Sequence, residues 1–177
     1  MNSRHKTSGF TLIEMLAVVF IIAILVTIIV GVAALVQRRQ GVERTRTNMG
    51  VIHAAIEKFN EETGNYPEEL LDSLPPAGWP LDAQSQSEWY PFNRGAHLYR
   101  QLMIDPAPAA CRARLRDLTY QNDAIITMQG TRETFADGFK KYLDYRRSEG
   151  AGGTPLLLSA GADGQFNTQD DIRSDNR

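Results

Sequence analysis

The hydrophobic pattern of the chain begins with a long apolar run. No charged residue occurs between Met15 and Val36. At ~1.5 Å of rise per residue, a helix over this run is roughly 33 Å long, which is enough to cross a bilayer core of ~30 Å. A single segment inside a membrane satisfies its backbone hydrogen bonds only as a helix. The pattern therefore predicts a transmembrane helix, to which we assign residues 10–36.

Beyond this run the pattern changes to that of an amphipathic helix. Apolar residues recur at intervals of seven, three, four and three, at Val42, Met49, Ile52, Ile56 and Phe59. These intervals place them on one helical stripe. Gly64 is a natural helix-ending residue, and Pro67 prevents the helix from resuming. We predict a stalk helix over residues 37–63. A coiled coil is the alternative, but the stripe covers few heptads.

The remainder, residues 64–177, is predicted to be one globular domain of short elements. A helix is expected over Ala96–Ile104 and an apolar strand over Ala124–Met128. A glycine-rich turn separates Tyr142–Arg146 from Leu156–Ser159, which predicts an antiparallel hairpin. The expected fold class is α+β: a long N-terminal α-helix, half transmembrane and half amphipathic, packed on a small antiparallel β-sheet domain.

One basic segment is ambiguous in the sequence. Arg112, Arg114 and Arg116 alternate with smaller residues, which fits either a strand edge or a solvated basic patch. No aromatic residues are interleaved with them, so they do not suggest nucleic-acid binding. Cys111 is the only cysteine and cannot form an intrachain disulfide. We expect it to be a small buried hydrophobic residue.

Charge and length narrow the class of protein. The chain has 177 residues, with 19 basic and 21 acidic side chains and a net charge of −2. The length suits one soluble domain plus an anchor. The slight negative charge argues against a general nucleic-acid binder.

The N-terminal end of the apolar run contains a residue with a high free-energy cost in a membrane. Glu14 is a carboxylate at the edge of the hydrocarbon, which costs at least ~2.5 kcal/mol without a partner. Arg4 and Lys6 precede the run and hold the N-terminus in the cytoplasm. A secretory signal peptide would be cut after the run, and no suitable site of small residues follows Val36.

The order Gly9-Phe10-Thr11-Leu12-Ile13-Glu14, followed by an apolar run, resembles the class III signal of type IV pilins and type II secretion pseudopilins. The resemblance implies that a prepilin peptidase cleaves between Gly9 and Phe10 and methylates the new amine. Residues 1–9 are then a leader, and the mature chain begins with N-methylphenylalanine at Phe10. The new ammonium of one subunit is a natural partner for Glu14 of its neighbour. An ordinary signal anchor is the alternative interpretation.

An acidic loop follows the predicted hairpin. Carboxylates occur at Asp163, Asp170 and Asp171 within residues 159–172. Calcium prefers oxygen ligands, and the absence of Cys and His here disfavours zinc or copper. The spacing is not that of an EF-hand. From the residues alone, a solvated acidic loop is as good an interpretation as a metal site.

The order of residues in this loop nevertheless resembles the calcium loop of the major type II secretion pseudopilin. The resemblance implies that the three aspartates bind calcium, with Ser159 and Thr168 as further candidate ligands. A second segment, Asp137 to Tyr145, resembles a divergent form of the Asp-Pro-Trp-Gly-x-Pro-Tyr-x-Tyr segment of the same family. It departs from that pattern at Lys140 and Tyr142.

No catalytic constellation is visible in the sequence. His53 and His97 have no evident partner set, and the G-x-S-x-G, P-loop and H-E-x-x-H motifs are absent. We therefore expect a structural protein rather than an enzyme.

The resemblance implies a subunit of a type II secretion pseudopilus that polymerises through its N-terminal helix to drive protein export. Its partners would be other copies of itself, the prepilin peptidase, minor pseudopilins and the inner-membrane secretion platform. It would span the inner membrane once, with the N-terminus cytoplasmic and the C-terminal domain periplasmic. The alternatives are a type IV pilin serving adhesion, motility or DNA uptake, and a membrane-anchored extracytoplasmic binding domain.

Overall fold

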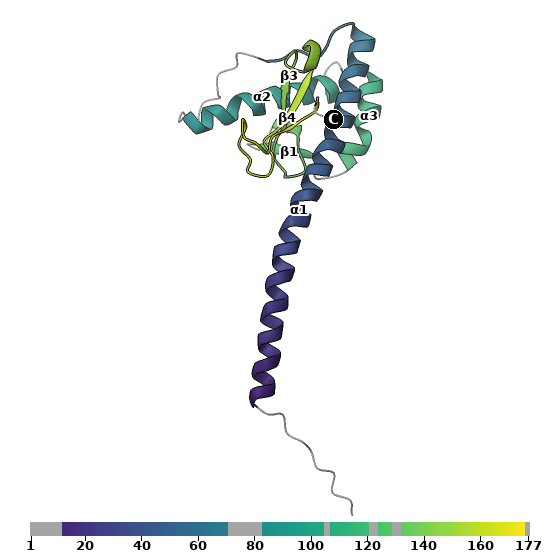
Figure 1. Ribbon diagram of the computed structural model, residues 1–177. Coiled ribbons are helices and arrows are strands. Elements are labelled where there is room, and N and C mark those ends of the chain that lie inside the picture. The colour runs from purple at the N-terminus through teal and green to yellow at the C-terminus, as the bar shows by residue number, and fades with distance from the viewer. Residues whose placement is uncertain (1–11, 71–82, 105–106, 121–123, 129–131, 176–177) are drawn as a thin grey trace, which may run out of the picture. The chain divides into compact units, whose positions relative to one another are not determined.

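The computed structural model describes residues 12–70, 83–104, 107–120, 124–128 and 132–175 (Figure 1). The chain divides into two compact units, residues 1–39 and residues 40–177. Helix α1, Leu12–Thr63, supplies the described part of the first unit and continues into the second.

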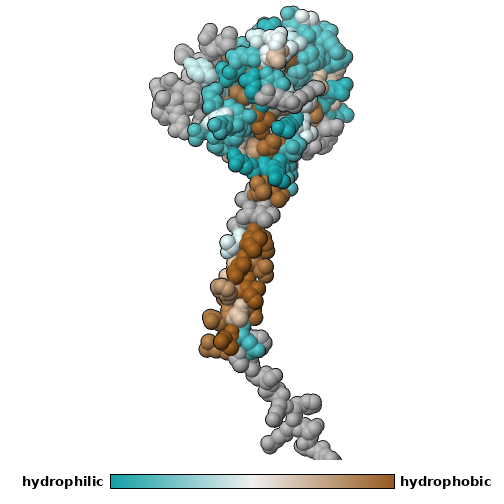
Figure 2. All heavy atoms as spheres, viewed as in Figure 1, coloured by the Kyte–Doolittle hydropathy of each residue, from teal (hydrophilic) through white to brown (hydrophobic). Residues whose placement is uncertain are grey.

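The described part of the first unit is helical, and its apolar side chains from Leu12 to Ile29 are exposed. Residues Leu12–Ile29 are long and apolar enough to cross a membrane, and none of them is buried within the molecule (Figure 2). The predicted apolar helix is confirmed in its type over the described residues. Gly9 and Phe10 lie outside the described residues.

The stalk part of α1 packs into the core of the second unit. Met49, Ile52 and Ile56 are buried, as the helical stripe predicts. The helix ends at Thr63, and Gly64 follows with a positive φ of 77°. The Gly64 N–H donates to the Asn60 carbonyl at 2.8 Å, a C-terminal capping bond that satisfies one of the last carbonyls.

Helices α2, Ala83–Met103, and α3, Ala109–Tyr120, complete the helical part. The helix predicted over Ala96–Ile104 is confirmed in type, but α2 begins 13 residues earlier and contains Pro91. The sequence pattern missed this extension because its first residues are polar and Pro91 reads as a break. Tertiary contacts with the sheets hold α2 together instead.

The basic segment lies on α3, so the strand alternative is wrong. Cys111, Leu115 and Leu118 are buried at helical spacing on one side of α3. The arginines lie on the exposed side, which satisfies the expectation of a solvated face. The Cys111 thiol donates to the Ala55 carbonyl of α1 at 3.4 Å, so the cysteine is buried as expected.

The strands form two small antiparallel sheets. Strands β1, Ile125–Met128, and β2, Arg132–Phe135, pair with each other. The second sheet has the order β3-β4-β5, and its strands are Asp144–Arg146, Leu156–Ser159 and Ile172–Arg173. A short 3-10 turn, η1, Ala151–Gly153, connects β3 to β4. The predicted strand near Ala124 and the predicted hairpin are both confirmed. Together with the helices, these sheets give the expected α+β class.

A buried ion-pair cluster ties α2 to the second sheet. The Asp144 side chain is fully buried and accepts from Arg94 Nε at 2.7 Å and Arg146 Nε at 2.9 Å. Arg94 also donates through Nη2 at 2.7 Å, so that contact is bidentate. Paired guanidinium groups offset the cost of burying this carboxylate. Nearby, Tyr145 donates its hydroxyl to the Pro67 carbonyl at 2.9 Å, which fixes the segment after α1.

Candidate functional site

The first candidate site is the N-terminal end of α1. Glu14 lies in the first turn of this helix and its side chain is exposed. A carboxylate in the first turn is stabilised by the partial positive charge of the helix N-terminus. The cleavage junction, Gly9 and Phe10, belongs to the residues that are not described, so of the two predicted assembly residues, Glu14 and Phe10, the structure places only Glu14.

The second candidate site is the acidic loop between β4 and β5. Its centre is the Asp170 carboxylate, which accepts from the Ala162 N–H at 2.8 Å, the Asp163 N–H at 3.1 Å and the Thr168 hydroxyl at 2.7 Å. Gly161, with a positive φ of 63°, packs so closely on the Asp170 backbone that no Cβ fits there. The loop therefore folds back on itself around Asp170.

The other two aspartates of the loop also shape its backbone. Asp163 accepts from the Gln165 N–H at 2.8 Å, and Asp171 accepts from the Asn167 N–H at 2.8 Å. The Thr168 hydroxyl lies between Asp170 and Asp171, at 2.7 and 3.4 Å from their oxygens. Four of the five predicted ligand residues are thus brought into one hydrogen-bonded loop.

The hydrogen bonds to Asp170 affect its titration. The Thr168 hydroxyl and then the loop N–H groups lower the pKa of Asp170 to about 2, against partial burial, which raises it. The carboxylate therefore stays ionised well into the acid range.

Ser159, the fifth predicted ligand residue, faces a different partner. Its hydroxyl donates to Asp137 Oδ2 at 2.6 Å and accepts from the Gly161 N–H at 3.1 Å. Asp137 is buried and also accepts from the N–H groups of Phe139 and Lys141 at 2.8 and 2.9 Å. Burial raises the pKa of Asp137, and the bonds from Ser159, Lys141 and Phe139 oppose that shift. The sequence signal for Asp137 was its weak family resemblance, which did not reveal this role.

The side chains of the loop offer the kinds of oxygen ligand that calcium prefers. Their present arrangement does not form a calcium site. Carboxylate and hydroxyl oxygens are the ligands that calcium prefers. Within the described residues, however, no three His, Cys, Asp or Glu side chains stand together as a metal-binding group. The aspartate oxygens instead accept the loop's own N–H and O–H groups, so metal binding would require some of these bonds to be exchanged.

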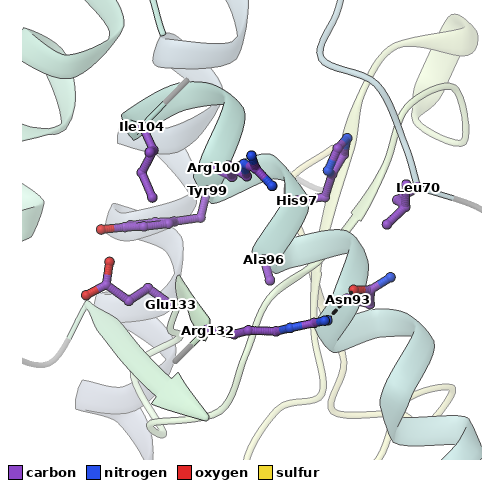
Figure 3. Close-up of a pocket in the computed structure, with 9 residues that line it drawn as sticks. All are labelled: Leu70, Asn93, Ala96, His97, Tyr99, Arg100, Ile104, Arg132 and Glu133. Atoms are coloured by element: carbon purple, nitrogen blue, oxygen red, sulfur yellow. Dashed lines mark hydrogen bonds between the residues drawn. The ribbon is translucent and has the colours of Figure 1, made fainter. Parts of the chain in front are cut away.

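A cavity of about 340 Å³ lies beside α2 and β2 and was not foreseen from the sequence (Figure 3). Arg132 crosses it, donating to Asn93 Oδ1 at 3.2 Å, with its guanidinium 5.2 Å from the centre of the Trp89 ring. Burial lowers the pKa of His97 in its wall, and burial raises that of Tyr99 to about 12. The cavity wall therefore combines His97 and Tyr99 with the charged residues Arg100, Arg132 and Glu133.

A second cavity, of about 510 Å³, runs along the stalk part of α1 beside β5. Its lining includes Gly50, His53 and Ala54 of the helix and Arg173 of the strand. Gly50 leaves open space where a Cβ would stand. The lining is mixed in polarity, and it also contains Ser174 and Glu57, whose Oε1 lies 3.9 Å from His53 Nδ1.

Comparison with curated proteins and with solved structures gives no significant match. The family model described as the prokaryotic N-terminal methylation motif matches residues 4–30. These residues contain the Gly9–Phe10 junction, Glu14 and all but the last part of the predicted transmembrane run. The chain therefore carries the class III signal of type IV pilin-like proteins, which are structural subunits processed by a prepilin peptidase.

Proposed function

We propose that this protein is a filament subunit of a type II secretion pseudopilus, held in the inner membrane before assembly with its C-terminal unit in the periplasm. The observation that carries the proposal is the class III signal at residues 4–30, together with the apolar helix Leu12–Ile29, of which no residue is buried within the molecule. Such a helix needs either lipid or other helices around it.

Glu14 supplies the specificity of assembly in this proposal. Packing alone gives little drive for helices to leave lipid, because lipid tails are as apolar as leucine. A charge pair between Glu14 and the Phe10 ammonium of a neighbouring subunit would offset the desolvation of both groups. The pair would also fix the axial offset between the two subunits. Minor pseudopilins and the inner-membrane secretion platform are the expected further partners.

The test compares three variants in the host. Gly9→Val should block maturation, because a branched side chain crowds the scissile bond. Glu14→Val should insert and be cleaved normally but fail to enter filaments. Glu43→Gln, an exposed carboxylate of the same helix beyond the apolar run, is the matched control and should assemble like the wild type. The readouts are membrane level, N-terminal sequence and the amount of subunit in purified filaments.

Two outcomes would overturn the proposal at different points. Mature protein that begins at Met1, or after a cut beyond Val36, removes the processing step. Normal filaments and normal export with the Glu14→Val protein would show that Glu14 is not required for assembly. Deletion of the gene separates a secretion filament from a pilus. Loss of exported proteins supports the secretion filament. Loss of adhesion, motility or DNA uptake alone supports a pilus.

We further propose that the acidic loop binds calcium, through Asp163, Asp170 and Asp171 with Thr168 beside them. Support comes from the oxygen-only donor set and from the convergence of these four residues in one folded loop. A bound calcium ion would supply a fixed positive charge to the loop. Ser159, whose hydroxyl already donates to Asp137, would serve mainly to hold the beginning of the loop.

A further inference from the structure

Residues 136–142, which we call the Asp137 turn, contact the stalk part of α1 on one side. The Gly138 N–H donates to Thr45 Oγ1 at 2.9 Å, and Asn48 Nδ2 donates to the Ala136 carbonyl at 3.1 Å. The Phe139 ring packs so closely on Gly41 that no Cβ fits on that glycine. Gly41, Thr45 and Asn48 are spaced by four and three residues, so the turn is held against one face of the helix.

The same turn also contacts the acidic loop. Asp137 Oδ2 accepts from the Ser159 hydroxyl at 2.6 Å, and that hydroxyl accepts from the Gly161 N–H at 3.1 Å, at the beginning of the loop. The rings of Tyr142 and Phe166 lie 5.8 Å apart, and Phe166 belongs to the loop. The Asp137 turn therefore contacts both the loop and the helix within the second unit.

Asp137 joins these two sets of contacts in one side chain. One carboxylate oxygen, Oδ1, accepts from the Phe139 and Lys141 N–H groups and so fixes the backbone of the turn. The other, Oδ2, accepts from Ser159. The carboxylate is buried, where an unmade hydrogen bond is costly, so a change at Ser159 must be accommodated by the turn itself.

We propose that Asp137 is a positioning residue that couples the conformation of the acidic loop to the docking of α1 residues 41–48. Whatever binds or contacts the loop then changes how firmly this part of the stalk is held. By thermodynamic reciprocity, a contact that holds or releases the stalk changes the affinity of the loop for its ligand by the same coupling free energy. The inference goes beyond the proposed function, since it requires neither filament assembly nor a bound metal.

The experiment measures backbone amide exchange in the full chain in detergent micelles, without added metal. Asp170→Asn weakens the centre of the loop, far along the chain from the stalk. We expect it to speed exchange of amides 42–48 at least threefold, while the α3 amides 111–118 stay unchanged. In a Ser159→Ala background, where the contact with Asp137 is absent, the same Asp170→Asn change should alter exchange at 42–48 by less than 1.5-fold.

Glu149→Gln is the matched control, because it removes an acidic charge from an exposed position on the β3–β4 connection. It should leave exchange at 42–48 unchanged. The proposal is overturned if Asp170→Asn has no effect on the stalk amides. It is equally overturned if the full effect persists in the Ser159→Ala background, or if α3 exchange rises in parallel, since either shows a route that does not involve Asp137.

Discussion

The two units of this protein place their apolar side chains in opposite ways. In the first unit the large aliphatic residues of Leu12–Ile29 are exposed, and in the second the aliphatic residues of the same helix, such as Ile52, are buried. One continuous helix therefore carries exposed apolar side chains in the first unit and buried ones in the second. The second unit covers the apolar stripe of its part of the helix with its own core, while the aliphatic side chains of Leu12–Ile29 are left uncovered within the molecule.

The largest expected difference between the units comes from shortening one isoleucine in each. Ile52→Ala removes a fully buried side chain and should destabilise the second unit by about 2–5 kcal/mol, because a cavity remains. Ile22→Ala, at a side chain that is 53% exposed, should leave that stability unchanged. Denaturant unfolding in micelles, followed by the fluorescence of buried Trp89, measures both. Equal losses from the two variants would contradict the distinction between the units.

Calcium should stabilise the second unit only. If the acidic loop binds it, the gain is about 2.7 kcal/mol at a hundredfold excess over Kd. Asp163→Ala should abolish the gain, and Glu149→Gln should retain it. Thermal unfolding with and without chelator measures the effect. An unchanged melting temperature, in protein shown to be free of metal, would identify the loop as a solvated acidic turn.

Replacing two glycines of α1 by alanine should give smaller stability changes, but of opposite sign. A Cβ at Gly41 collides with the Phe139 ring, so Gly41→Ala should destabilise the second unit by about 1–3 kcal/mol. A Cβ at Gly50 meets nothing within 4 Å, so Gly50→Ala should stabilise it by about 1 kcal/mol through helix propensity. Denaturant unfolding of the two variants provides the test. Effects of the same sign would show that the close contact at Gly41 is not rigid.

The smallest expected effect is a pH dependence of the folding stability that arises from the acidic loop. Because the pKa of Asp170 is lowered to about 2 in the folded chain, the ionised form is the one that folding favours. Its contribution to stability is present above pH ~4 and is lost as the pH falls toward 2. The stability difference between wild type and Asp170→Asn should therefore shrink across this range. Thr168→Val, which removes the largest cause of the shift, should reduce that pH dependence.

The sequence predicted those parts of the fold that depend on periodicity. The apolar run, the stalk stripe and the β3–β4 hairpin follow directly from spacing and turn residues. The full length of α2 did not, because its first turns are polar and contain Pro91. Only packing against the sheets supports a helix there, and packing is not visible in local propensity.

The candidate sites likewise contain some features that the sequence revealed and others that only the fold shows. Glu14 was conspicuous because a carboxylate beside an apolar run is rare, and the acidic loop because its three aspartates are clustered. The partnership of Ser159 with Asp137 was not foreseen, since 22 residues separate them and nothing in the spacing predicts the contact. Arg132 over Trp89 was missed for the same reason.

The buried position of Cys111 has a practical consequence for labelling experiments. It is the only thiol of the chain, it is fully enclosed between α3 and α1, and burial raises its pKa. Thiol reagents attack the thiolate, so the folded wild-type protein should be inert to them. A cysteine introduced at an exposed position, such as Glu43, would then be the single reactive thiol. Crosslinks between such residues can report the spacing of neighbouring subunits without removal of the native cysteine.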